Sequence, residues 1–251
     1  MPEWFRAFFD ETFADAFLAA PDPEKAAAEA RIVQERLGLR PGHRVLDVPC
    51  GNGRLTLPMA QAGLVMTGID LAEDYIERAR RDAEREGLDV RYLVADMRRL
   101  DFDGEFDAAF NWGGSFGYFD ADEDRLAAER LLAAARPGGR VLVEADNGPW
   151  VRAHAELERN LVVGGYRVLQ SGRIDEATGR LHSTWTYLRG GETRRRELSL
   201  RLYDAEELAA LLSAAGCCDV HAFGLYPETE PATAQSSRLV AIGRRSTEGS
   251  A

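Results

Sequence analysis

Short apolar segments alternate with longer amphipathic segments along the chain up to Asn147. Apolar runs that alternate with helical segments of about 10–15 residues are typical of right-handed βαβ units, which build a parallel sheet with helices on both faces. The predicted strands are Arg44–Val48, Leu64–Ile69, Val90–Ala95, Phe106–Asn111 and Arg140–Ala145, and the predicted helices between and before them are Pro23–Leu37, Leu55–Ala62, Ala72–Glu86 and Asp122–Ala135. The pattern therefore predicts an α/β domain.

The pattern changes after Asn147, where strand-like runs follow one another without helices between them. Three such runs, Val162–Leu169, Leu181–Leu188 and Arg195–Leu202, are separated by turn-like segments that contain glycine. They predict a three-stranded antiparallel cap. A capped helix, Asp204–Ala215, follows, with Glu207 completing a capping box. The runs Cys218–Leu225 and Arg238–Arg244 predict two closing strands, which brings the main sheet to seven.

The N-terminal segment carries aromatic residues at helical spacing, with Phe5, Phe9, Phe13 and Phe17 on one face of a predicted helix. Such a face either packs on the core or forms a lid over a site, and we favour the lid because the helix lies outside the α/β core in sequence. We therefore expect a lid at 1–40, a cofactor-binding core at 41–147, a cap at 148–203, the last helix and strand pair at 204–245, and a frayed tail at 246–251.

Composition narrows the possible partners. The chain has 251 residues, a net charge of −11 and 45% hydrophobic residues, so it has enough apolar side chains for a core and too little positive charge for non-specific nucleic-acid binding. The three cysteines, Cys50, Cys217 and Cys218, fit neither a disulfide framework nor a zinc site, and no metal is expected. Because neither a signal peptide nor a long apolar stretch occurs, we expect a cytoplasmic protein without membrane contact.

Three predicted parallel strands end in a carboxylate at the same edge of the sheet. The three carboxylates belong to Asp47, Asp70 and Asp96, and a turn containing Gly51 and Gly53 follows the strand that ends at Asp47. Open α/β sheets bind ligands at this edge, and a carboxylate at the end of the second strand accepts hydrogen bonds from ribose hydroxyls. The arrangement predicts a site for a nucleoside cofactor.

The glycine turn distinguishes among nucleoside cofactors. Thr56 stands where a dinucleotide motif has its third glycine, and the lysine of a phosphate-binding loop is absent. Asp47 would repel a phosphate but suits an ammonium group. A cofactor without a pyrophosphate is therefore favoured.

At this point the sequence resembles the class I S-adenosylmethionine-dependent methyltransferases. The runs that carry the resemblance, in the family's order, are VLDVPCGNGR, GIDLAEDYIERAR, VADMRRLDF, FDAAFNWGGSFGYF and RPGGRVLVEAD. The resemblance implies a Rossmann-like seven-stranded sheet and S-adenosylmethionine as cofactor, with S-adenosylhomocysteine as product. The sequence departs from the commonest form of the family's glycine motif at Pro49 and Arg54, where glycines often occur.

The same resemblance implies roles for individual residues. The methionine portion of the cofactor would be lined by Asp47, Gly51, Asn52 and Gly53, and Cys50, inside the same loop, is a further candidate cofactor contact. The ribose, the adenine and the reactive end of the cofactor would be contacted by Asp70, Leu71, Asp96, Met97 and Asn111.

The run Ser115–Phe119 is similar to that of small-molecule methyltransferases that act on amino sugars and amines. Tyr118 is the implied catalytic residue beside the acceptor, and His182 in the cap is a second candidate. Trp112, Phe116 and Asn147 are candidate substrate contacts.

The expected function is in-line methyl transfer to nitrogen or oxygen of a small molecule, and a homodimer is possible. The alternatives are a nicotinamide-dependent reductase, a cofactor-binding module without turnover, and a nucleic-acid methyltransferase. Thr56 and Asp47 disfavour the reductase, and the acidic net charge disfavours nucleic acid.

Overall fold

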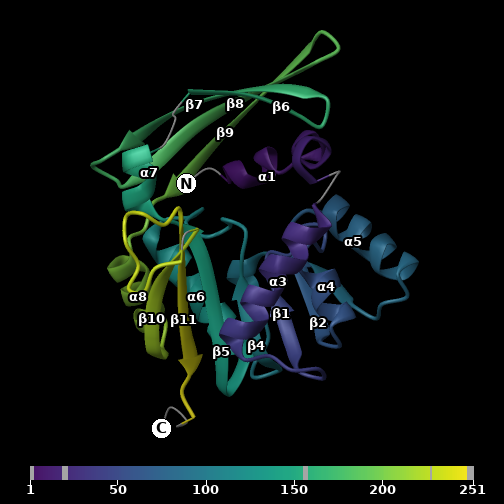
Figure 1. Ribbon diagram of the computed structural model, residues 1–251, viewed down its shortest axis with the longest axis vertical. Coiled ribbons are helices and arrows are strands. Elements are labelled where there is room, and N and C mark those ends of the chain that lie inside the picture. Colours follow the sequence, from purple (N-terminus) through teal and green to yellow (C-terminus); the bar gives the residue numbers. More distant parts are fainter. Residues whose placement is uncertain (1–2, 19–21, 155–157, 227, 248–251) are drawn as a thin grey trace.

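The computed structural model describes residues 3–18, 22–154, 158–226 and 228–247. Its main sheet has seven strands in the order β10-β11-β5-β4-β1-β2-β3 (Figure 1). Neighbours from β3 to β5 pair in parallel, whereas β11 runs antiparallel to both β5 and β10. The strands are β1 (Arg44–Asp47), β2 (Val65–Asp70), β3 (Arg91–Val94), β4 (Phe106–Asn111), β5 (Ala135–Asp146), β10 (Cys217–Leu225) and β11 (Arg238–Arg245). The expected α/β class and seven-stranded sheet are confirmed.

Both faces of this sheet are buried by helices. Leu46 packs with α6 (Ala121–Ala134) and α8 (Ala205–Ala214), while its neighbour Val45 packs with α3 (Pro23–Leu37) and α4 (Thr56–Gln61) on the other face. A fifth helix, α5 (Glu73–Arg85), packs against β3. Side chains of a strand alternate between faces, so this burial explains the nearly continuous apolar composition of the central strands.

Helix boundaries agree closely with the sequence signals. The helix α3 begins after Asp22, whose side chain accepts hydrogen bonds from two backbone amides, and ends at Gly38 in a left-handed conformation. The capping box of Asp204 and Glu207 at the start of α8 is present. Within the described residues, no helix is long and apolar enough to cross a membrane.

The cap has four strands, so the prediction of three is wrong. The four-stranded sheet contains β6 (Glu158–Val163), β7 (Tyr166–Asp175), β8 (Arg180–Arg189) and β9 (Glu192–Arg201), and a short helix α7 (Gly148–His154) precedes it. The predicted strand at 162–169 spans the hairpin between β6 and β7. Its turn is Gly164-Gly165, which has positive φ at both residues and is typical of a two-residue hairpin turn.

The N-terminal segment is not one continuous helix. It forms α1 (Trp4–Phe8), α2 (Glu11–Phe13) and the π-helical turn η1 (Ala14–Leu18). Asp10 has an extended backbone, and its side chain accepts hydrogen bonds from the amides of Thr12 and Phe13, so it ends the first helix and caps the second. The expected continuous aromatic face is therefore wrong.

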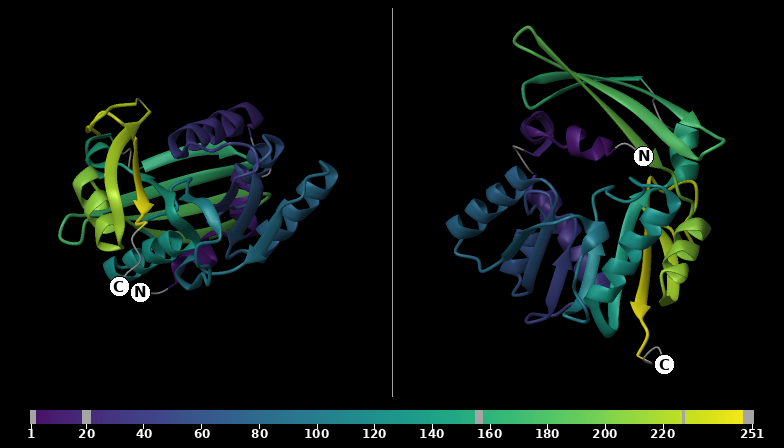
Figure 2. Two further views of the ribbon diagram at one scale, coloured as in Figure 1. Left: turned by 90° about the horizontal axis from the view of Figure 1, so that it is seen from below. Right: turned by 180° about the vertical axis from the view of Figure 1, so that it is seen from behind.

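This segment lies between the main sheet and the four-stranded sheet (Figures 1 and 2). Phe8 packs edge-on against Trp185 of β8 with ring centroids 5.1 Å apart, and Arg196 of β9 forms an ion pair with Asp10. Of the expected tail, residues 248–251 lie outside the described part of the chain.

A buried arginine joins the four-stranded sheet to the loop after β4. Arg180 of β8 is only 6% exposed, and its guanidinium donates to the carbonyl oxygens of Phe119 at 2.7 Å and of Gly117 and Tyr118 at 3.3 Å. It also donates to the hydroxyl and carbonyl oxygens of Ser199. The loop that carries Tyr118 is thus fixed from the cap.

We expect Arg180→Met to lower the free energy of unfolding by about 2–3 kcal/mol, because the buried carbonyl of Phe119 and the Ser199 oxygens lose their donor. Urea denaturation measures this change. Arg173→Met, at an exposed position of β7, is the matched control and should change stability by less than about 0.5 kcal/mol. Equal effects of the two substitutions would contradict the assignment.

Candidate active site

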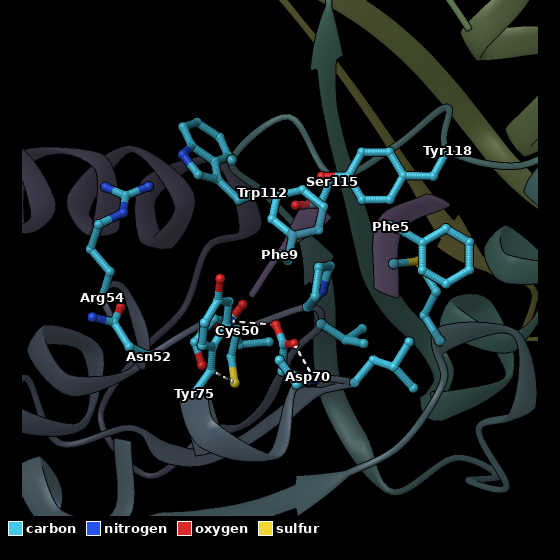
Figure 3. A pocket seen from close by; sticks show the side chains of 18 of the residues that line it. Phe5, Phe9, Cys50, Asn52, Arg54, Asp70, Tyr75, Trp112, Ser115 and Tyr118 are labelled. Atoms are coloured by element: carbon cyan, nitrogen blue, oxygen red, sulfur yellow. Dashed lines mark hydrogen bonds between the residues drawn. The ribbon is translucent and has the colours of Figure 1, made fainter. Parts of the chain in front are cut away.

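A cavity of about 320 Å³ lies at the carboxyl edge of the parallel strands. Its walls come from the turn after β1, the ends of β2 and β3, the loop after β4 and the N-terminal segment (Figure 3). The topology explains the position, because the carboxyl ends of parallel strands meet at one edge and the connecting loops surround it.

The glycine turn forms one wall. Gly51 has φ +57°, and a Cβ built on it would meet no atom within 4 Å, so its backbone faces the cavity. Gly53 has φ +83° and lies behind the wall, where a Cβ would come within 2.5 Å of the Tyr92 hydroxyl. Cys50 lines the cavity, and burial raises the pKa of its thiol. Gly53 therefore shapes the turn through packing, while Gly51 leaves room for a ligand.

Asp47 is a buried carboxylate at the end of β1. Its side chain is 3% exposed and accepts a hydrogen bond from the Thr56 hydroxyl at 2.6 Å. Burial raises its pKa to about 7, which the Thr56 hydrogen bond and the charge of Arg54 oppose, while the charge of Asp70 adds to the increase. A cation placed in the cavity would stabilise the ionised form.

Asp70 lies at the end of β2 and fixes the glycine turn. One carboxylate oxygen accepts the amide of Gly51 at 2.8 Å, and the other accepts the amide of Ala72 at 2.9 Å. Burial raises the pKa of Asp70, although these amides oppose the increase. A carboxylate offers about four acceptor positions, so hydroxyl groups of a ligand still find acceptors here. Leu71 and Tyr75 line the cavity beside it.

Asp96 follows β3 and is held by Arg98. Although burial opposes it, hydrogen bonds from Arg98 hold the pKa of Asp96 below its usual range. Arg98 also pairs with Glu123 and with Glu3 of the N-terminal segment, each at 2.7 Å. Sequence reasoning missed Arg98, because no spacing rule distinguishes it from the other arginines of the chain.

Met97 lines the cavity, whereas Asn111 lies behind it. The Asn111 side chain is 3% exposed and its amide nitrogen lies 3.8 Å from the Met97 sulfur. Its side-chain oxygen is buried and has no hydrogen-bond partner among the described residues. Asn111 thus lies behind Met97, at the end of β4.

Tyr118 lines the opposite end of the cavity. Its ring packs between aromatic residues of the N-terminal segment, with centroids 5.0 Å from Trp4 and 5.6 Å from Phe9. Figure 3 shows the ring near Ser115. Burial raises the Tyr118 pKa, so the phenol stays neutral at physiological pH. The hydroxyl can orient a ligand without acting as a strong base.

The N-terminal segment closes the cavity from above. Phe5, Phe9, Phe13 and Leu18 line it, and the Asn52 side chain donates to the Leu18 carbonyl oxygen at 3.1 Å. The hydroxyl of Tyr75 donates to the carbonyl oxygen of Asp10 at 3.4 Å. The glycine turn and α5 are therefore joined directly to this segment.

Of the remaining predicted catalytic and substrate-binding residues, one lines the cavity and three do not. Trp112 lines the cavity, and its indole N–H donates to Glu29 at 3.0 Å. Three others are not among the described residues that line it. Phe116 packs against Tyr203 in the core, Asn147 donates to the carbonyl oxygens of Thr233 and Ser236, and His182 lies on β8.

Two features test whether S-adenosylmethionine fits these residues. Asp47 is buried with a hydroxyl partner and a raised pKa, so the ammonium group of an amino acid would supply a counter-charge. Gly51 leaves open space where any other residue would place a side chain. The cavity volume also lies within the range of ligand pockets, about 300–1,000 Å³. The residues fit this cofactor.

Comparisons with known proteins agree with the geometry. Residues 45–139 match a family model described as a methyltransferase domain. An uncharacterized protein of Mycobacterium tuberculosis is 35% identical over 105 residues, which cover 41% of this chain and 37% of that protein. The match thus spans little more than a third of that relative.

Two solved structures are similar over nearly the whole chain. The CcbJ methyltransferase of Streptomyces caelestis has 21% identity and a TM-score of 0.75, with 93% of this chain and 96% of that chain covered. An amino pentose methyltransferase of Micromonospora echinaspora has 21% identity and a TM-score of 0.64, with 90% and 92% covered. The chain has the fold of the class I S-adenosylmethionine-dependent methyltransferases, and its residues 45–139 match the methyltransferase-domain model.

Proposed function

We propose that this protein transfers a methyl group from S-adenosylmethionine to a nitrogen atom of a small amine, with a hydroxyl acceptor as the second choice. The observation that carries the proposal is that Asp47, Asp70 and Asp96 line the same cavity as the glycine turn, with Tyr118 at its other end. The cofactor, when bound, supplies an electrophilic methyl group on a sulfonium.

The carboxylates divide the cofactor between them in this proposal. Asp47 pairs with the ammonium group, and Asp70 accepts the ribose hydroxyls while its bonds to Gly51 and Ala72 keep it in place. Leu71 and Met97 pack against the adenine, and Asp96 accepts from its amino group. Arg98 orients Asp96 for that role, because it donates to both carboxylate oxygens.

Tyr118, Ser115 and Trp112 contact the acceptor. Holding the acceptor in line with the methyl group supplies much of the rate enhancement, because positioning removes the entropy cost of a bimolecular encounter. A neutral amine needs no strong base, which agrees with a Tyr118 phenol that burial keeps protonated. A hydroxyl acceptor would need a base, so nitrogen is favoured.

The N-terminal segment acts as a lid in this proposal. It contacts the glycine turn through Leu18 and the four-stranded sheet through Asp10, so it covers the cavity and excludes water. Cofactor and acceptor enter when it opens. The small cavity and the net charge of −11 both favour a small acceptor over a nucleic acid.

We expect S-adenosylhomocysteine to bind with a Kd of about 1–100 µM, in the usual range for enzyme ligands. Isothermal titration calorimetry measures the affinity. Incubation with S-adenosylmethionine and a panel of primary and secondary amines, followed by mass spectrometry, should show methylated product. Absence of binding at millimolar ligand would overturn the proposal, and binding without turnover on any acceptor would favour a sensor.

Tyr118→Phe should slow methylation of the accepted amine by about 10–100-fold, because the acceptor loses its orienting hydroxyl. Its affinity for S-adenosylhomocysteine should stay within about twofold, since the hydroxyl contacts the acceptor. Tyr166→Phe, on β7 and not among the described residues that line the cavity, is the control. Unchanged turnover in Tyr118→Phe would remove Tyr118 from the proposed mechanism.

Asp47 should couple cofactor binding to proton release. With a pKa of about 7, Asp47 is about half protonated at pH 7. Pairing with the ammonium group of the ligand favours the ionised carboxylate. Binding of S-adenosylhomocysteine should therefore release about half a proton per molecule. Titrations in buffers of different ionisation enthalpy measure this number. Asp47→Asn should bind more weakly and release no such proton.

The same group sets a pH dependence of stability in the ligand-free protein. Between pH of about 4 and about 7, the Asp47 carboxyl is protonated in the folded protein but ionised in the unfolded chain. The free energy of unfolding therefore falls as pH rises through this range. Asp47→Asn lacks this cost, so it should gain stability relative to the wild type over that pH range. A constant difference between the two proteins would contradict the raised pKa.

A further inference from the structure

The charged groups that line the cavity are unevenly distributed. Among the described residues they are Asp47, Asp70, Asp96, Arg6 and Arg54. Arg6 is about half exposed and pairs with Glu3, which also binds the Arg98 that holds Asp96. It therefore lies at the Asp96 end. Arg54 follows the glycine turn, so it is the cation at the Asp47 end.

Arg54 is held by a buried carboxylate. Its Nη1 donates to Glu29 Oε2 at 2.6 Å, and the same oxygen accepts the Trp112 indole N–H at 3.0 Å. Glu29 lies on α3 and is 5% exposed. One edge of the guanidinium is thus fixed, while the remaining N–H groups have no acceptor among the described residues.

The free edge of Arg54 reaches toward the loop after β4. A Cβ built on Gly113 would lie 4.0 Å from Arg54 Nη2. Figure 3 shows Arg54 beside Asn52, on the side of the cavity where Trp112 also lies. The guanidinium therefore lies between the glycine turn and the loop after β4, on the Trp112 side of the cavity and away from Tyr118.

Glu29 does not neutralise Arg54 alone. Glu29 is shared by Arg54 and by Lys25, whose Nζ lies 4.0 Å from it, so two cations surround one carboxylate. The charge of Arg54 also acts on Asp47, where it opposes the rise in pKa. A carboxylate and a cation side by side, each with unused hydrogen-bonding capacity, complement the two charges of an α-amino acid.

We propose that Arg54 binds the carboxylate of the methionine portion of S-adenosylmethionine, while Asp47 binds the adjacent ammonium. This role rests on the proposed function. The three cavity carboxylates repel an anion, so Arg54 is the charged group at this end that attracts one. Glu29 is a positioning residue, because it orients the guanidinium without lining the cavity.

The test compares S-adenosylhomocysteine with its decarboxylated analogue, which keeps the amine and lacks the carboxylate. In the wild type the carboxylate should strengthen binding by about 10–100-fold, as a charge-assisted hydrogen-bonded pair does. Arg54→Gln should weaken binding of S-adenosylhomocysteine by a similar factor and leave the analogue within about twofold. Arg54→Lys should retain part of the preference. Isothermal titration calorimetry measures all three proteins.

Two controls separate this role from structural damage. Arg31→Gln removes an exposed arginine of α3 and should change neither affinity. Arg54→Gln leaves the Glu29 carboxylate buried with only Lys25 at 4.0 Å as a counter-charge, so the double variant Arg54→Gln, Glu29→Gln removes both charges of the lost pair. It should unfold at a temperature close to the wild type and still lack the preference for the carboxylate.

The outcomes are distinct. An equal loss of affinity for both ligands in the double variant, or no loss for either, overturns the role of Arg54. A wild type that binds neither ligand overturns the proposed function itself. A wild type that binds both ligands equally well overturns only the recognition of the carboxylate.

Discussion

Three carboxylates line one cavity, and the arrangement of this edge of the protein depends on how their charges are balanced. Each carboxylate has a different kind of hydrogen-bonding partner. Asp96 has an arginine, Asp70 has two backbone amides, and Asp47 has one hydroxyl. The pKa of Asp96 is accordingly lowered, whereas those of Asp70 and Asp47 are raised by burial. The least compensated of the three, Asp47, is also the most buried, so a cationic ligand group gains most by binding there, at the end of β1.

The contacts that balance these charges also connect the parts of the molecule. Arg98 bridges Asp96 to Glu3 of the N-terminal segment and to Glu123 of α6. Glu29 joins α3 to the glycine turn and to Trp112 after β4. Glu144 of β5 accepts the amides of Gly113 and Gly114, both at 2.8 Å, and pairs with Arg238. The loops around the cavity are thus held by charged groups behind them.

The sheet and most of its helices could be predicted from the sequence because their signals are local. Gly38 ends α3 and Asp204 caps α8 within a few residues of chain, and strand-end acids are visible as soon as the strands are. The errors arose where the signal depends on tertiary contacts. Gly164-Gly165 lies within a β-branched run, yet it forms a hairpin turn that packs closely on Asp15 and Ala16. Asp10 ends a helix that the aromatic spacing alone would continue. Arg180 has no sequence signature, since its partners lie far away in the chain, and nothing local marks Arg98 as the arginine that also reaches Glu3 and Glu123.

The ion pair between Asp10 and Arg196 joins residues that are 186 positions apart. A ribosome therefore completes the cofactor core well before it makes the strand on which the N-terminal segment packs. Domains fold largely as units during synthesis, and contacts of high sequence separation form late. The aromatic side chains of the first seventeen residues must wait without their partners on β8 and β9 while the rest is made. The roof of the cavity can consequently assemble only after β8 and β9 have been made, and until then the nascent chain leaves its most aromatic segment without these partners.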